Sequence, residues 1–388
     1  MRHHRFCLYG GPLFDGERLL PRGTLVFNRH KVLHVYEGDK PRAADAAIDV
    51  RGQLISAGLV DLHSDALEKC IEMRPGVFFD PEFALQNLDR RVAACGITTF
   101  CHAVSFADNE LGLRSCEEAE NLVRLIRRFA NSAKATVRHL VHLRCEVSSN
   151  RTIETAQRLA REQLLDLVSF MDHTPGQGQF KTLQAYLNYY TETYKISRDQ
   201  ASIMADRKRE LRDEGWQKLS LLARSLREAS LPILSHDDDS AEKVALVNEL
   251  GATAAEFPVT MAAATTARER GMKVFMGAPN LIRGCSSNGH LRAIETIGGN
   301  VCDGLLSDYY PECLLQAPFL AAKTLNLPLE KTLKLVISNP GHFLSQHAGH
   351  GWLLPEMPAD VVVIDCSAPW ARVTQTWVEG KRAFCADH

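Results

Sequence analysis

Between residues 58 and 310, short apolar runs alternate with longer stretches of helical periodicity. Eight such runs can be read: GLVDLH, GITTF, VRHLVHLRCE, DLVSFMDH, LPILSHD, GATAAEF, KVFMGAPN and VCDGLLSDYY. Helical stretches between apolar strands imply parallel pairing, because parallel neighbours need a long crossover connection. Ser115 and Glu118 form a capping-box pattern before one of these helices. The pattern therefore predicts an α/β protein with a (β/α)8 barrel of the TIM type.

The two ends of the chain have a different pattern. Short β segments punctuated by Gly, Pro and Asp fill residues 1–55, and ADVVVIDC and TQTWVEGKRAF follow the same pattern near the other end. Chain termini often lie close together in a folded protein. We therefore expect residues 1–55 and 350–388 to form one small composite β-sandwich, and residues 56–349 to form the barrel.

One connection in the barrel is much longer than the others. Roughly sixty residues separate His173 from His236, whereas βα loops usually have about 2–6 residues. This stretch predicts a helical insertion at about 178–230, placed at the rim of the barrel like a lid. Its tyrosines are spaced as on one helical face, which fits internal packing and substrate contact equally well; they are Tyr186, Tyr189, Tyr190 and Tyr194.

Composition narrows the class of partner. The 45 Lys and Arg and the 47 Asp and Glu are interspersed, and the net charge of -2 leaves no basic face for nucleic acid. No apolar run approaches the roughly 20 residues needed to cross a membrane, and the N-terminus lacks the apolar core of a signal peptide. The 11 cysteines are scattered without a C-x-x-C pair, as suits a reducing compartment. We expect a cytoplasmic protein that acts on a small molecule.

Metal-ligating residue types recur where the apolar runs end. In a (β/α)8 barrel the C-terminal ends of the strands converge on one face, so these side chains would meet there. Imidazole together with carboxylate suits zinc, manganese or iron. We therefore expect two divalent metal ions, zinc first, with manganese or iron as alternatives. The candidate ligands are His63, Asp65, Glu146, His173, His236 and Asp308.

Roles for these residues follow from spacing and chemistry. His63 and Asp65 are two positions apart on a strand, so both can face one ion. Glu146 could bridge the two ions, and the two later histidines would complete the second site. Asp308 is expected to touch one ion and to act as the general base that accepts a proton from the attacking water. Each residue taken alone also has an ordinary structural explanation. Asp61, for example, is an acid on a strand that needs no metal ion to explain it.

At this point the chain resembles the amidohydrolase superfamily, whose barrels carry a first-strand H-x-H or a variant of it, a bridging acid, two later histidines and a last-strand Asp. More narrowly, it is similar to the phosphonate-metabolism M family of the carbon–phosphorus lyase pathway. The resemblance implies a barrel with a composite β-sandwich and a bound metal pair. It rests on AGLVDLHSDALEK, HLRCE, SFMDHTPGQ, SHDD, AEFP, GAPN followed by RG, and LSDYYP, which span residues 57–311 in the family's order.

The resemblance also implies a reaction. That family hydrolyses the triphosphate of ribose 1-alkylphosphonate 5-triphosphate and leaves the 5-phosphate and pyrophosphate. Such a polyanion needs cationic groups and hydroxyl or backbone donors around it. We expect these to come from near the first strand and from the loop GAPNLIRGCSSNG; the candidates are Lys69, Arg74, Arg283, Ser286 and Ser287.

The chain departs from the family's pattern at Gly178, Ser287 and Asn288, and this leaves the substituent on the sugar open. Three other functions stay open: a deacetylase or cyclic amidase, a hydrolase of a related phosphorylated sugar, and a catalytically silent assembly subunit. The oligomeric state is also open, with a homodimer as one option. Finally, the strand count places the two later histidines on the fourth and fifth strands, one earlier than in the superfamily. A strand hidden in the insertion would restore that pattern.

Overall fold

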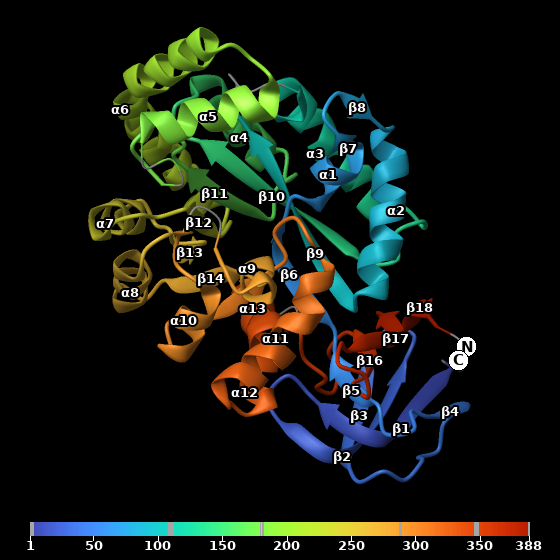
Figure 1. Ribbon diagram of the computed structural model, residues 1–388. Helices are drawn as coiled ribbons and strands as arrows, with labels where there is room; N and C mark the ends of the chain where they lie inside the picture. Colours follow the sequence, from blue (N-terminus) through green and yellow to red (C-terminus); the bar gives the residue numbers. More distant parts are fainter. Residues whose placement is uncertain are drawn as a thin grey trace.

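The computed structural model describes residues 4–107, 112–178, 180, 182–286, 289–344 and 349–386. It has two parts, a barrel of alternating strands and helices and a smaller sheet built from both ends of the chain (Figure 1). Two positions singled out in the sequence, Ser287 and Asn288, lie outside the described residues. In the described ranges, no helix is both long and apolar enough to cross a lipid bilayer.

Eight parallel strands form the barrel, and their order in the sheet is their order along the chain. The predicted (β/α)8 barrel is therefore confirmed. His173 follows the fourth strand and His236 ends the fifth, and the described part of the insertion contains no further strand between them. The strands are β6 (Leu59–Ser64), β9 (Ile97–Phe106), β10 (Arg138–Glu146), β11 (Leu167–Met171), β12 (Ile233–His236), β13 (Ala254–Glu256), β14 (Lys273–Gly277) and β15 (Gly304–Leu306).

The last strand returns to the first at the end of the barrel that carries the candidate ligands. A parallel bridge joins Ser64 to Asp308, and the Asp308 N–H donates to the His63 carbonyl oxygen at 3.0 Å. Asp61 strengthens this seam, because its carboxylate accepts the backbone N–H of Ser307 at 3.1 Å and that of His63 at 3.4 Å. The closure thus fixes His63 and Asp308 relative to each other.

Helices pack around the barrel, and two apolar clusters hold it together. A large cluster lies between strands and helices, and a smaller one fills the barrel interior with Val60, Leu62, Cys101, Leu167, Leu234, Ala254, Phe275 and Leu306. Ser115 Oγ accepts the Glu118 N–H at 3.3 Å, so α3 begins where the capping pattern predicted. The surrounding helices are α1 (Ala66–Ile71), α2 (Pro81–Ala94), α3 (Cys116–Ala130), α4 (Asn150–Arg161), α7 (Ala241–Glu249), α8 (Met261–Glu269), α9 (Ala278–Arg283), α10 (Ala293–Gly298), α11 (Glu312–Leu325), α12 (Leu329–Leu333) and α13 (Ser338–Leu344).

The second sheet combines strands from both termini, as the composite β-sandwich prediction required. The C-terminal strand β16 pairs antiparallel with β5 from the N-terminal part, and β5 pairs in parallel with β1. The termini lie close together at this end of the molecule (Figure 1). The strands are β1 (Arg5–Phe14), β2 (Leu19–Asn28), β3 (Val32–Glu37), β4 (Ala46–Asp49), β5 (Leu54–Ala57), β16 (Val361–Asp365), β17 (Arg372–Val378) and β18 (Lys381–Cys385).

The connection from β11 to β12 carries two helices, α5 (Leu183–Tyr194) and α6 (Arg198–Glu228), which lie over one side of the barrel rim (Figure 1). Helix α6 is docked tightly, because a Cβ at Gly215 would clash with the backbone oxygen of Val147. Two of the four tyrosines, Tyr186 and Tyr190, are fully buried in an apolar cluster of the insertion. For these two, internal packing explains the helical spacing.

Candidate metal centre and substrate pocket

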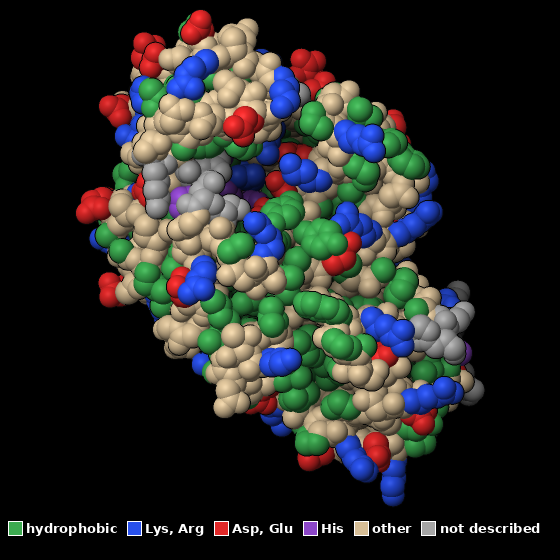
Figure 2. All heavy atoms as spheres, in the orientation of Figure 1, with side chains coloured by type: hydrophobic (Ala, Val, Ile, Leu, Met, Phe, Trp, Pro, Cys, Tyr) green, Lys and Arg blue, Asp and Glu red, His purple; other side chains and the backbone are tan. Residues whose placement is uncertain are grey.

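A cavity of about 290 Å³ opens at the C-terminal ends of the barrel strands. Figure 2 shows the hollow below the helical insertion, with histidine and Lys or Arg side chains visible inside it. Three residues at this rim have a left-handed backbone without being glycine: Asp237 at φ 54°, Phe257 at φ 55° and Asp308 at φ 55°. Such conformations cost of order 1–3 kcal/mol each and cluster at functional sites. The backbone at the cavity is thus held in place by its surroundings.

Glu256, the last residue of β13, orients two histidines at once. Its Oε2 lies 2.8 Å from His63 Nδ1 and its Oε1 lies 2.9 Å from His236 Nδ1. A carboxylate only accepts hydrogen bonds, so both rings donate from Nδ1, and in its neutral form each ring keeps its lone pair on Nε2. Burial alone raises the pKa of Glu256, but the facing imidazoles, His63 first, lower it by more, and the net pKa lies well below its usual range. Glu256 is therefore an ionised support for two candidate ligands.

Glu146, at the end of β10, supports a third histidine in the same way. Its Oε2 lies 3.0 Å from His173 Nδ1, and its Oε1 accepts the His173 N–H at 3.3 Å and the Ser148 hydroxyl at 3.0 Å. Among the described residues, the buried His173 Nε2 has no hydrogen-bond partner. That nitrogen is available to a metal ion.

Two groups of side chains in the described ranges bring potential ligand atoms within 4.8 Å of one another. One is His63, His142 and Glu256, and the other is His173, His236 and Asp237. Burial lowers the pKa of His236 to about 4, so its ring is neutral and able to ligate. The second group contains both of the later histidines that the sequence assigned to one ion.

Two carboxylates complete the wall of the cavity. Burial, and after it the negative charge of Asp65, raise the pKa of Asp308 to about 7. Asp65 is also buried, and its Oδ1 has no hydrogen-bond partner among the described residues. A cation between two such carboxylates relieves their repulsion. The imidazole and carboxylate donors, with orphaned atoms turned to one cavity, fit divalent ions of the zinc, manganese or iron type.

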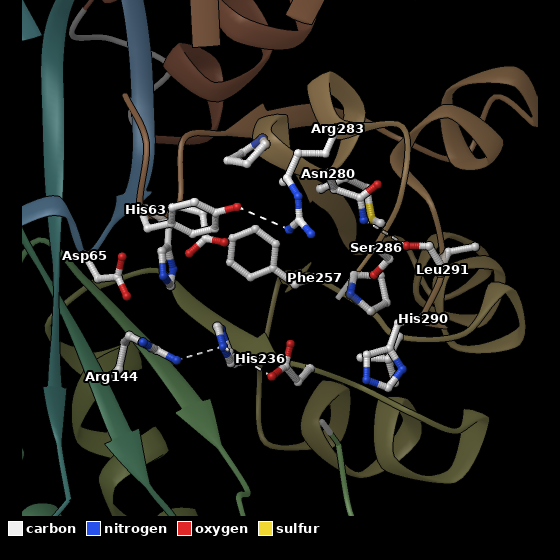
Figure 3. A pocket seen from close by; sticks show the side chains of 18 of the residues that line it. His63, Asp65, Arg144, His236, Phe257, Asn280, Arg283, Ser286, His290 and Leu291 are labelled. Atoms are coloured by element: carbon white, nitrogen blue, oxygen red, sulfur yellow. Dashed lines mark hydrogen bonds and ion pairs between the residues drawn. The ribbon is translucent and has the colours of Figure 1, made fainter. Parts of the chain in front are cut away.

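Of the residues singled out in the sequence, most lie in one place. The cavity is lined by His63, Asp65, His173, His236, Asp308, Lys69, Arg283 and Ser286. Figure 3 shows His63, Asp65 and His236 on one side of it, with Arg283 and Ser286 across from them. Glu146 does not line the cavity and lies behind His173. Arg74 is exposed on β7 (Glu72–Arg74), outside the lining, and Gly178 uses its N–H to bind Asp239 at 2.8 Å.

Several residues of the site were missed in the sequence. His142 and Arg144 could have been found, because they lie four and two positions before Glu146 on one strand and so share its face. Glu256 is the last residue of β13, and a single acid in a three-residue strand gives no sign of the direction in which its side chain points. Among the described residues that line the cavity, Tyr189 is the only one of the insertion's four tyrosines. Also in that lining are Arg114, Asp237, His290 and Tyr309.

One buried lysine of the helical insertion contacts the candidate metal centre. Lys208 on α6 is 1 % exposed, and its Nζ lies 3.7 Å from Glu146 Oε2 and 3.5 Å from the Tyr190 hydroxyl. Lys208→Met is expected to lower the affinity of the His173 site for zinc by about tenfold, because Glu146 loses its compensating charge and holds His173 less firmly. Zinc titration of metal-free protein measures this.

The matched control is Lys218→Met on the same helix, since Lys218 pairs with Glu214 at the surface. It should leave zinc affinity unchanged. Equal zinc binding by the Lys208 variant and the wild type would show that α6 does not support the centre.

Comparison with known proteins places the chain in a family. No protein-family model matches the sequence. Alpha-D-ribose 1-methylphosphonate 5-triphosphate diphosphatase of Escherichia coli K12 is 33% identical over 341 residues, which are 87% of this chain and 90% of that protein. Solved structures show the same fold at low identity: an amidohydrolase (TM-score 0.64, 14% identity, 99% of both chains) and the 5-methylcytosine deaminase of Klebsiella pneumoniae (TM-score 0.66, 15% identity, 98% of both chains). The chain therefore belongs to the family of alpha-D-ribose 1-methylphosphonate 5-triphosphate diphosphatases, on the amidohydrolase fold.

Proposed function

We propose that the protein is a metal-dependent hydrolase that cleaves the triphosphate of ribose 1-alkylphosphonate 5-triphosphate to the 5-phosphate and pyrophosphate in phosphonate catabolism. The observation that carries the proposal is the membership of this family together with the cationic lining of the cavity. Lys69, Arg114, Arg144 and Arg283 surround the candidate ligands. These cationic side chains suit a polyanion better than a neutral amide, although Arg114 also pairs with Glu68 at 3.2 Å. No observation favours the deacetylase or cyclic amidase alternative in the same way.

The metal part of the proposal is two divalent ions, zinc first. His63, Asp65 and Asp308 would hold one ion, and His173, His236 and Asp237 the other. Glu146, which the sequence suggested as a bridge, is proposed instead to orient His173, because its carboxylate contacts His173 Nδ1. When bound, the ions would supply Lewis acidity that activates water and neutralises charge on the phosphate groups.

The protein's own residues would do the remaining work. Asp308 accepts the proton of the attacking water, in the position of a general base at the cavity wall. Lys69, Arg283 and Ser286 bind phosphate or phosphonate oxygens and orient the chain of phosphates. The water oxygen forms a bond to phosphorus, the anhydride P–O bond breaks, and pyrophosphate leaves. The substrate is thus a small phosphorylated sugar, and the free thiols of the described cysteines fit a cytoplasmic setting.

Phosphorus NMR tests this function directly. The metal-loaded protein incubated with a sugar 5-triphosphate is expected to give pyrophosphate and a sugar 5-phosphate in equal amounts, because the bond between the first and second phosphates is cut. Oxygen-18 water then reveals which phosphorus is attacked, since the label enters one product only. Steady hydrolysis of N-acetyl or cyclic amide substrates, with no pyrophosphate from any sugar triphosphate, would contradict the proposal.

A further inference from the structure

Arg144 lines the cavity beside the candidate metal ligands. It lies on β10 and is 6 % exposed. Its Nη2 is 2.8 Å from His236 Nε2, the dashed contact at the lower left of Figure 3. Its Nε is buried and has no hydrogen-bond partner among the described residues. Its charge also acts on the pKa of His63, His142 and Asp308, so one cation stands close to both ligand groups.

The contact with His236 conflicts with metal binding. Glu256 holds the His236 proton on Nδ1, so Nε2 is the atom whose lone pair a metal ion needs. A guanidinium donates hydrogen bonds, accepts none and does not lose its proton in proteins. The Nε2 lone pair can therefore serve Arg144 or a metal ion, and it cannot serve both. When an ion binds there, Arg144 must take another acceptor.

The acceptor that suits this position best is an anion. Arg144 would then stand next to divalent cations that repel it, and the neighbouring carboxylates of Asp65, Asp237 and Asp308 would be shared with those cations. A phosphoryl group supplies what is missing, since its oxygens carry negative charge and match the two parallel N–H bonds of a guanidinium. A neutral amide substrate offers no such partner. A guanidinium at this position therefore suits a phosphoryl substrate better than a neutral amide substrate.

We propose that Arg144 binds the phosphoryl group of the substrate inside the metal centre, changing partner from His236 Nε2 to phosphoryl oxygens when metal is bound. The inference deepens the proposed function and rests on it for the identity of the substrate. Arg144 would be a substrate-contacting residue that favours phosphoric anhydrides over amides. Lys69, Arg114 and Arg283, further out in the lining, would then bind the remaining charges of the polyanion.

The test uses inorganic pyrophosphate as the probe and calorimetry on the zinc-loaded protein. Arg144→Met is expected to keep its zinc and to bind pyrophosphate at least about tenfold more weakly than the wild type. Arg144→Lys keeps the charge but loses the paired N–H geometry, and it should fall between the two. In the metal-free protein, Arg144→Met should take up zinc at least as tightly as the wild type, because the competitor for His236 Nε2 is gone.

The matched control is Arg138→Met. Arg138 lies on the same strand at the opposite end and pairs with Asp360 and Glu379. It should lower the melting temperature and leave pyrophosphate affinity unchanged. If Arg144→Met does not fold, as circular dichroism would reveal, Arg144→Lys carries the test, with weaker pyrophosphate binding at full zinc content as the expected result.

Two results would overturn the inference. Unchanged pyrophosphate affinity in a folded, zinc-loaded Arg144 variant means that the guanidinium does not bind the phosphoryl group. Loss of zinc, as severe as in His236→Ala, means that Arg144 only supports His236. Failure of the proposed function would be seen in a different experiment. The wild type would then release no pyrophosphate from sugar triphosphates, whether or not Arg144 contributes to the binding of pyrophosphate.

Discussion

Replacing Asp308 by Asn is expected to reduce turnover of a sugar 5-triphosphate by about 10²–10⁴-fold, the usual contribution of a general base. The amide has the same shape as the carboxylate but cannot take the proton. The backbone should not change, because Asn tolerates the left-handed φ of 55° that this position has. The backbone bonds to His63 and Asp65 also use main-chain atoms alone. The loss would therefore report chemistry and not folding.

Zinc content separates the two roles that Asp308 can have. Elemental analysis of Asp308→Asn should find close to the zinc of the wild type, because the other ligands remain. His236→Ala is the comparison, and it should lose zinc together with activity. An Asp308 variant as poor in zinc as His236→Ala would show that Asp308 mainly holds the metal, and one with normal turnover would place the general base elsewhere.

The barrel could be predicted from the sequence because its signal is repeated. Each strand is a short apolar run, and each candidate ligand lies where a run ends, so a misread boundary of one or two residues leaves the ligand at the same face. The order of His173 and His236 illustrates this. The strand count that placed them on the fourth and fifth strands was correct, although the superfamily pattern suggested one strand more.

The direction of single side chains could not be predicted in the same way. Arg74 lies only a few positions from the predicted site, but α1 ends before it and the short strands β7 and β8 (Val77–Phe78) carry it to the surface. Tyr186 and Tyr189 share one helix, and neighbouring elements alone decide that the first is buried and the second faces the cavity. These outcomes depend on how the helices and strands pack against one another, and hydrophobic periodicity carries no information about that packing.

Glu256 is the clearest omission, and it is expected to matter greatly for metal binding. Glu256→Gln should weaken zinc binding at one site or both by about 10–100-fold, the usual effect of removing a residue that orients metal-ligating histidines. The physical reason is the loss of one acceptor. The carboxylate accepts from His63 Nδ1 and from His236 Nδ1, whereas the amide has one oxygen and one NH₂ group. The imidazole that faces the NH₂ group must move its proton to Nε2, where it blocks the metal.

Two measurements check this prediction. Zinc titration gives the affinity, and long-range ¹H–¹⁵N spectra of the imidazoles give the tautomer, which should be Nδ1-protonated for both rings in the wild type and mixed in Glu256→Gln. Asp238→Asn is the matched control, because Asp238 is an equally buried acid at this rim that binds Ser235 and Lys243 and, within the described part of the chain, no imidazole. If Glu256→Gln shifts the tautomer without weakening zinc, then the lone pairs on Nε2 are not the metal ligands. If it changes neither, the carboxylate does not orient the rings, and the tautomer must be set by the metal ions themselves.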